Sequence, residues 1–441
     1  MGIRTALPFA PLAARSHIAA GLPAVLVGSH PGRRVNPPLY EIARRLGDRL
    51  CAAVRPLRVL DAVRWPGEVE TAFLAAGGSS LPPVTPDTYC RPLGFDPPDK
   101  LRELSRLAAD TRDHLGTDHP AARLLLKTIR EAELTVRLIA ARGTPDFTPL
   151  SRQLFGSAVS AAWLPDLTAL LERLLDTLPA DKPEPALSAE EAAADLAARF
   201  AAYFGAAGIR VVVCDSLSSD AAAGNGYLKL RAGATFTPSV VRLLEVHEGW
   251  AHLGTTLNGR AQALLPTLAK CSPSATRTQE GLAVFLELVT GSAGRGRVRK
   301  LLNRARAVAM AEAGADFRDV YRFFLAATDS PAESYRHAAR VFRGGLPGAG
   351  GPFTKDLSYC EGLLKVLRFV AGELSRGGWG RVSLLVCGKV AVEDVPLLAE
   401  LGRDGWLAPP RWVPPPLRDR DALVAKVRAL GANVARGRGV G

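Results

Sequence analysis

Hydrophobic residues recur every three to four positions through most of the first half of the chain, which is the spacing of amphipathic helices. The pattern predicts a helix over 37–56, two long helices between 97 and 142, and two more in SAVSAAWLPDLTALLERLLDTL and SAEEAAADLAARFAAYFGAAG. Ser188 and Glu191 form a capping box at the start of the last of these. We therefore expect residues 37–207 to form a helical N-terminal part.

The periodicity changes after residue 207. IRVVVCDS (209–216) is a β-branched run of strand length, and YLKLR (227–231) alternates apolar and polar residues as an exposed or edge strand does. Thr237 and Pro238 supply the N-cap and the first position of the next helix. Further helices are expected near 276–292, 296–313, 331–343 and 355–377, with VSLLVCGKV (382–390) as a candidate third strand. The expected fold class is α+β, predominantly helical with a small β-sheet.

The composition is that of a globular protein, with 47% hydrophobic and 22% charged residues among 441. It excludes a disordered, collagen-like or coiled-coil chain. The net charge of +13 favours anionic partners, but the arginines are scattered and no nucleic-acid motif accompanies them, so no nucleic-acid partner is expected. Six cysteines lie far apart without a C-x-x-C pair, which indicates reduced thiols and a cytoplasmic protein. No apolar run reaches about 18 residues, so no membrane span is expected.

The most informative segment reads His-Glu-Gly-Trp-Ala-His, from His247 to His252. The usual zinc-protease helix places its two histidines four positions apart on one face, with a glutamate beside the metal as the base. Five positions apart, the two side chains diverge by about 140° on a regular α-helix. Both bind one ion only if the helix widens locally, and Gly249 eases that distortion because it has no Cβ.

A third ligand is expected from TQEGLAVFLEL (278–288), a segment of helical periodicity with Glu280 near its N-terminus. Catalytic zinc takes three protein ligands and keeps one position open for water. His247, His252 and Glu280 match that set, with one Zn²⁺ per chain, and Glu248 is then the base that takes a proton from the water. The candidates to orient a ligand histidine are Glu245 and Glu287.

At HEGWAHLGTTLNG (247–259) and TQEGLAVFLE (278–287) the sequence resembles the QEGLA-motif family, and further matches extend the resemblance over roughly 95–370. These bacterial proteins are often labelled flavohemoglobin-expression-modulating and are related to the microtubule-associated tyrosine carboxypeptidases. The resemblance implies a zinc-metallopeptidase-like domain with the ligands and base named above. It also implies a carboxypeptidase acting on a peptide or protein C-terminus. The chain is closer to the bacterial branch, so the resemblance supports peptidase chemistry more than tyrosine specificity.

A carboxypeptidase needs a cationic pocket for the terminal carboxylate of its substrate, and arginine forms it best. The basic residues in the matching C-terminal motifs are Arg340, Arg343 and Lys355. The side chains in the same region able to donate a hydrogen bond to a tetrahedral oxyanion are Tyr335, His337 and Tyr359. As a sheet edge, YLKLR is also suited to pair with an extended substrate.

These assignments divide the chain into four regions. They are an N-terminal extension without an assigned fold (1–36), the helical part (37–207), a catalytic zinc-binding part (208–345) and a C-terminal part completing the same domain (346–441). Two alternative functions stay open, as does the oligomeric state. One is a dipeptidyl-peptidase-like zinc exopeptidase, whose cleft needs carboxylates for a free amino terminus. The other is a non-catalytic, zinc-stabilised regulatory protein.

Overall fold

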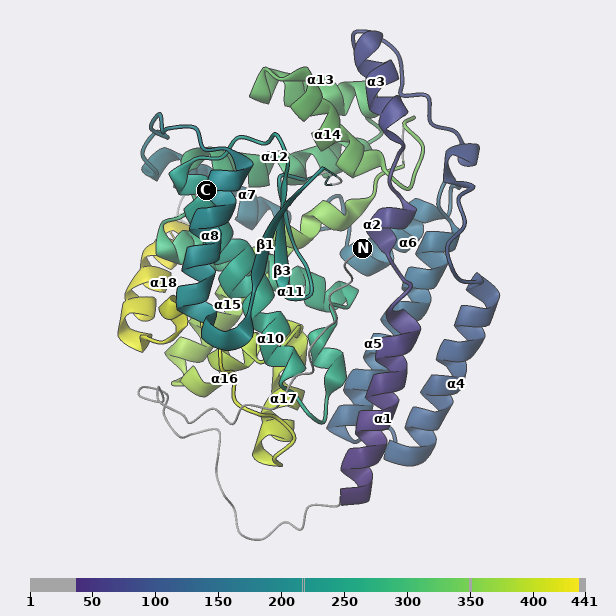
Figure 1. Ribbon diagram of the computed structural model, residues 1–441, viewed down its shortest axis with the longest axis vertical. Helices are drawn as coiled ribbons and strands as arrows, with labels where there is room; N and C mark the ends of the chain where they lie inside the picture. The colour runs from purple at the N-terminus through teal and green to yellow at the C-terminus, as the bar shows by residue number, and fades with distance from the viewer. Residues whose placement is uncertain (1–36, 216, 218, 349–350, 436–441) are drawn as a thin grey trace, which may run out of the picture.

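The computed structural model describes residues 37–215, 217, 219–348 and 351–435, so the N-terminal extension lies outside the described residues. The N-terminal part is helical as expected, and α1, α4 and α5 pack side by side along one flank of the molecule (Figure 1). Its helices are α1 (Pro37–Val54), α2 (Val59–Ala62), α3 (Gly67–Ala75), α4 (Pro97–Leu115), α5 (Pro120–Ala140), α6 (Phe147–Phe155), α7 (Leu164–Thr177) and α8 (Ala189–Phe204), with the short 3₁₀ turns η2 (Pro86–Tyr89) and η3 (Gly205–Ala207). The capping box at Ser188 and Glu191 is confirmed in both directions.

The second half is also mainly helical. Thr237 caps the helix that follows the sheet, with Pro238 at its first position, as predicted. Its helices are α9 (Pro238–Leu244), the π-helix η4 (Glu245–Leu253), α10 (Gly254–Arg260), α11 (Pro273–Thr290), α12 (Arg295–Glu312), α13 (Phe317–Thr328), α14 (Pro331–Phe342), α15 (Leu357–Ser375), α16 (Trp379–Ser383), α17 (Val395–Arg403) and α18 (Arg420–Ala435), and its 3₁₀ turns are η5 (Pro266–Ala269), η6 (Thr354–Asp356), η7 (Leu384–Val386), η8 (Val392–Asp394) and η9 (Pro415–Leu417). No helix in these described ranges is long and apolar enough to cross a membrane.

The sheet has three strands in the order β1-β3-β2. β1 (Arg210–Cys214) runs parallel to β3 (Tyr227–Arg231), and the short β2 (Ala221–Ala223) pairs antiparallel to the other side of β3. Both predicted strands are therefore present, but the prediction that YLKLR is an edge strand is wrong. The three alanines of β2 carry no alternating pattern, and their pairing moves β3 to the centre of the sheet.

The prediction of a strand over 382–390 is also wrong. This segment forms the end of α16 and the 3₁₀ turn η7. Leu385, Val386 and Cys387 are all fully buried. In a short run of consecutive apolar residues there is no alternation of apolar and polar positions. Hydrophobic periodicity therefore does not distinguish a buried strand from a buried helical turn.

The π-helix η4 lies between two hydrophobic cores. Val246 and Trp250 belong to the main core, which is built from most of the other helices. Leu253 belongs to a second core, in which Phe200 of α8 packs near Leu228 of the central strand. The two cores together hold η4 in place from opposite sides.

Helices α11 and α15 cross with their backbones in contact. A Cβ added to Gly281 would lie 2.0 Å from the carbonyl carbon of Gly362, and one added to Gly362 would lie 1.9 Å from the Arg277 oxygen. Only glycine at both positions permits this approach. Because Glu280 directly precedes Gly281, the crossing also fixes where the Glu280 side chain leaves α11.

Candidate metal centre

The histidine pair is carried by the π-helix η4, so the predicted irregularity of this helix is confirmed. In a π-helix the backbone bonds span five residues, which brings His247 and His252 onto one face. Their ring centroids lie 4.8 Å apart. Gly249 has a second role here, because a Cβ at this position would lie 2.5 Å from the Phe200 ring.

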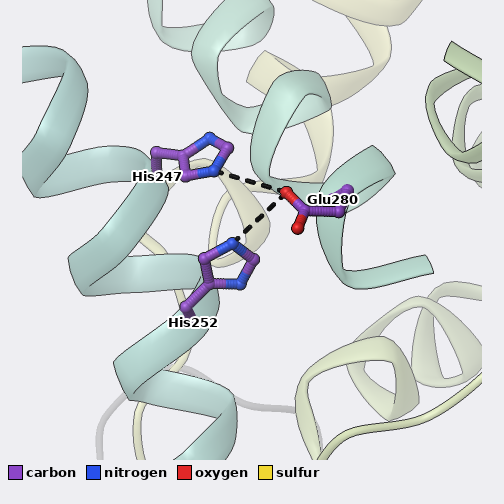
Figure 2. Close-up of side chains that lie close together, drawn as sticks. All are labelled: His247, His252 and Glu280. Atoms are coloured by element: carbon purple, nitrogen blue, oxygen red, sulfur yellow. Dashed lines mark ion pairs between the residues drawn. The ribbon is translucent and has the colours of Figure 1, made fainter. Parts of the chain in front are cut away.

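The three expected ligands meet at one point (Figure 2). Glu280 Oε2 lies 3.6 Å from Nε2 of His247 and 3.6 Å from Nε2 of His252. This oxygen is buried and has no hydrogen-bond partner among the described residues. Donors of a tetrahedral zinc site with bonds of about 2.0–2.1 Å lie roughly 3.3–3.4 Å apart, so the two distances to Glu280 are close to those of a zinc site. All three donor atoms lie within 4.8 Å of one another, and the set of two nitrogens and one oxygen suits zinc.

The surroundings of this point favour a positive charge. Burial lowers the pKa of His247, but Glu280 and Glu287 outweigh it and raise the pKa to about 10. Burial raises the pKa of Glu280, but His247 and His252 hold it well below its usual range. Two carboxylates therefore face the histidine pair, and a divalent cation between the donors would take the place of the shared proton.

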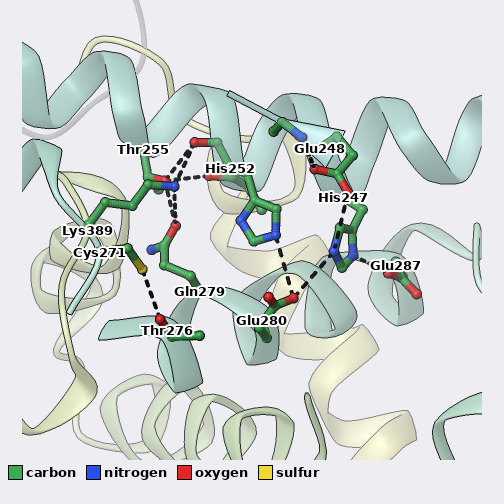
Figure 3. Close-up of polar contacts among 12 residues, drawn as sticks. His247, Glu248, His252, Thr255, Cys271, Thr276, Gln279, Glu280, Glu287 and Lys389 are labelled. Atoms are coloured by element: carbon green, nitrogen blue, oxygen red, sulfur yellow. Dashed lines mark hydrogen bonds and ion pairs between the residues drawn. The ribbon is translucent and has the colours of Figure 1, made fainter. Parts of the chain in front are cut away.

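Of the two glutamates that the sequence suggested for orienting a histidine, Glu287 contacts His247 (Figure 3). The Glu287 carboxylate is fully buried, lies 2.6 Å from His247 Nδ1 and receives two hydrogen bonds of 2.8 Å from Arg297. Burial raises the pKa of Glu287, but Arg297 and His247 lower it to about 2. The ionised carboxylate thus accepts the Nδ1 proton and leaves Nε2 directed at the metal position. Glu245 is paired with Arg199 and Arg242 instead.

Glu248 lies beside the three donors without joining them. Its Oε1 is 3.9 Å from His247 Nε2, and its Oε2 accepts a hydrogen bond of 3.1 Å from the backbone N–H of Ala223 in β2. The short strand that sequence reasoning missed therefore holds the carboxylate expected to be the base.

The site opens into a cleft of about 950 Å³. Five of the six expected substrate residues line it: Arg340, Arg343, Lys355, His337 and Tyr359. Tyr335 does not. Its side chain is 4% exposed and packs in the core against Phe73 and Phe317, because it faces the opposite side of α14 from the cleft-lining residues.

Among the cleft-lining aromatic residues, Tyr359 lies beside one of the three converging donors. Its ring is almost parallel to that of His247, with centroids 6.5 Å apart. His337 lies farther along the cleft, where its Nε2 is 3.2 Å from Glu333 and its ring packs on Phe324. Burial and the nearby cation Lys300 lower the pKa of His337 to about 4, so the imidazole is neutral at pH 7.

An arginine cluster lines the cleft beyond Tyr359, formed by Arg304, Arg340 and Arg343. Arg340 is bound by the Asp356 carboxylate at 2.8 and 2.7 Å. Arg304 lies over the Tyr359 ring and Arg343 over the Phe353 ring, and neither has an acidic partner among the described residues. Burial and the charge of Arg340 lower the pKa of both, that of Arg343 to about 10.

Sequence reasoning missed Arg304. It lies in α12, outside the motifs that drew attention to Arg340 and Arg343, and nothing distinguishes it from the other arginines of that basic helix. The cluster therefore carries more positive charge than its single carboxylate balances, which is suited to an anionic group.

Comparison with known proteins identifies the family. Residues 71–433 match the family model described as microtubule-associated tyrosine carboxypeptidase. No curated protein matches the chain. Among solved structures the chain is similar to a "putative lipoprotein" from Colwellia psychrerythraea, with 13% identity, a TM-score of 0.37 and coverage of 91% of this chain and 77% of that one, a likeness too low to bear on the argument. Since the matching family model spans most of the sequence, the chain belongs to the microtubule-associated tyrosine carboxypeptidase family.

Proposed function

We propose that this protein is a zinc-dependent carboxypeptidase that removes one residue from the C-terminus of a peptide or protein. One zinc ion per chain is held by His247, His252 and Glu280. The observation that carries the proposal is that three converging metal donors and two arginines without acidic partners line the same cleft. Membership of a carboxypeptidase family agrees with it.

When bound by these three residues, zinc would act as a Lewis acid that polarises the scissile carbonyl group and lowers the pKa of the water bound to it. Glu248 accepts the proton of the attacking water and later delivers it to the leaving amine. The Ala223 N–H supports this role because its hydrogen bond holds one oxygen of the carboxylate and leaves the other toward His247. Of the three side chains suggested as donors to the oxyanion, we assign this role to Tyr359, because its ring lies beside that of His247.

The terminal carboxylate of the substrate binds at the arginine cluster. Arg304 and Arg343 supply the donors, because Arg340 is already engaged by Asp356. A carboxylate there offsets the positive charge that lowers the pKa of both free guanidinium groups. The bidentate geometry of arginine suits such an acceptor.

The main chain of the substrate pairs with the sheet edge that lines the cleft. That edge is β2, since β3 is central. Extended peptides add to an exposed strand through main-chain hydrogen bonds, which require no particular side chain. The Ala223 N–H is already bound to Glu248 and the Ala221 oxygen to the Ser219 hydroxyl, so the substrate pairs with the remaining main-chain groups of this edge. The three alanines of β2 suit this role because their small side chains leave room above the strand.

The charges of the cleft argue against a dipeptidyl peptidase. Such an enzyme needs a carboxylate for a free amino terminus. Apart from Glu248 and Glu280, the acidic groups lining the cleft are Asp220 and Glu333. Asp220 is paired with Arg231, and Glu333 is paired with Lys300.

A peptide library analysed by mass spectrometry tests the proposal. The expected result is loss of single residues from free C-termini and no cleavage of the matching C-terminal amides. Release of N-terminal dipeptides would favour the dipeptidyl alternative. Zinc binding without turnover of any peptide would favour the regulatory alternative and overturn the proposal.

A further inference from the structure

A partly buried lysine at the edge of the cleft touches the helix that carries the histidine pair, at a point that the proposed chemistry does not use. Lys389 follows η7, and its Nζ donates a hydrogen bond of 2.8 Å to the backbone oxygen of His252. The same Nζ lies 3.1 Å from Gln279 Oε1 (Figure 3). Lys389 is itself anchored, because its backbone N–H donates to the Leu268 oxygen at 2.6 Å.

Gln279 completes a link between η4 and α11. Its side chain is 2% exposed, and its Oε1 lies 2.6 Å from the hydroxyl of Thr255, three residues after His252. An ammonium group can only donate, so the amide oxygen faces Lys389. The amide Nε2 has no partner among the described residues, and the link therefore runs through the oxygen alone.

This link joins two metal ligands that come from separate elements. Lys389 contacts the backbone of His252 itself, and Gln279 is the residue directly before Glu280. On the other side of the site, Glu287 of α11 holds His247. His247 is thus tied to α11 directly, through Glu287, and His252 is tied to α11 indirectly, through Lys389 and Gln279 (Figure 3). The proposed metal position lies between these two links.

A lysine is a costly residue at this position. Among the residues that the structure describes, no carboxylate forms a hydrogen bond or ion pair with its Nζ, which contacts only the two oxygens named above. A partly buried charge needs compensating partners, and Lys389 finds two neutral oxygens, one on each element that bears a proposed ligand. An apolar side chain would fill the space but would leave η4 and α11 unlinked here.

We propose that Lys389 and Gln279 act as a positioning pair that sets the separation of His252 from Glu280 and so raises the affinity of the site for zinc. The inference rests on the proposed metal site but not on the identity of the substrate. Residues that orient metal ligands typically contribute about 10- to 100-fold in metal affinity. Neither side chain is required to touch the metal.

The test measures zinc affinity of the full-length protein by competition with a chelator. Lys389→Met and Gln279→Leu are each expected to weaken zinc binding about 10- to 100-fold. The cobalt-substituted variants should show a changed d–d absorption spectrum, which a general loss of stability would not produce. Gln279→Glu keeps an oxygen for Lys389 and should retain most of the affinity.

Lys300→Met is the matched control, because Lys300 is a partly buried lysine of the same cleft that contacts neither η4 nor α11. Its zinc affinity should equal that of the wild type. Wild-type zinc affinity in both Lys389→Met and Gln279→Leu would overturn the inference, and a raised KM with normal affinity would make Lys389 a substrate contact instead. If Lys389→Met does not fold, Gln279→Leu decides alone. A wild-type protein that binds no zinc would defeat the proposed function as well.

Discussion

His247 Nδ1 lies 2.6 Å from Glu287 Oε1, a residue forty positions farther along the chain. The contact joins the middle of the π-helix to the second half of α11, and Arg297 at the start of α12 fixes the carboxylate. Three elements therefore determine the direction of one imidazole. The accuracy of the metal site depends on their packing and not on the motif alone.

Purified protein should contain about one zinc per chain, because the three donors fit a single ion. His247→Ala and Glu280→Gln should each lower zinc content sharply when measured by atomic emission. Removal of zinc by a chelator should leave most helical circular dichroism intact, since a chain of this length has a core independent of the ion. Full zinc retention in both variants would remove these residues from the ligand set.

Glu287→Gln should weaken zinc binding about 10- to 100-fold, because an amide orients and polarises His247 less than a carboxylate does. Glu245→Gln is the control: it changes a buried carboxylate on the same π-helix that forms ion pairs with Arg199 and Arg242. A chelator competition on both proteins separates the two effects. Equal loss of affinity in the two variants would mean that the loss comes from disturbance of η4.

Glu248→Gln should retain near-normal zinc content while its turnover falls on the order of a hundredfold or more, the scale of general base catalysis. The amide preserves the shape of the side chain and its contact with Ala223 but accepts no proton. Zinc content and kcat, measured on the same preparation, distinguish loss of the base from loss of the metal. Wild-type turnover would transfer the role of base to another residue.

Arg304→Gln and Arg343→Gln should each lower kcat/KM for free-acid peptides by roughly 10- to 100-fold, since a hydrogen bond to a charged group contributes about 1.5–3 kcal/mol. Discrimination against C-terminal amides should fall in parallel. Arg306→Gln changes an arginine of the same helix that is paired with Glu172 outside the cleft, and should leave both quantities unchanged. Undiminished discrimination in both cleft variants would place the carboxylate elsewhere.

Gly281→Ala should destabilise the protein by roughly 1–3 kcal/mol or more, the usual cost of overpacking, because the added methyl group meets the backbone at Gly362. Gly402→Ala provides the comparison. Gly402 lies in α17 with open space around it, so its replacement should raise helix stability slightly. Urea denaturation of both variants measures the difference, and equal stability would show that the two helices can separate at little cost.

The meeting of His247, His252 and Glu280 was predictable from sequence because the signals are local. The pair His247 and His252 lies within one motif, and Glu280 opens a helix of clear periodicity. Even the π-helix followed from the spacing, since two histidines five positions apart share an ion only on a widened helix.

The residues around the donors were not predictable in this way. Lys389 contacts a backbone oxygen 137 positions away, and that contact depends on a segment whose apolar run suggested a strand. Arg304 lies among several arginines of one helix, and only tertiary packing leaves it without an acidic partner. The position of β3 in the sheet depended on three alanines that have no strand pattern of their own.

The π-helix has a consequence for the residues that follow it. One extra residue in a regular α-helix rotates everything downstream by about 100°. Because η4 absorbs that residue, α10 keeps Asn258 facing both η7 and the extended segment near residue 412. Its amide group donates to the Val386 and Trp412 oxygens and accepts from the Trp412 N–H. Without the widened turns of η4, the same extra residue would rotate α10 and turn Asn258 away from these partners. The π-helix therefore also preserves the register by which Asn258 of α10 attaches the C-terminal segment.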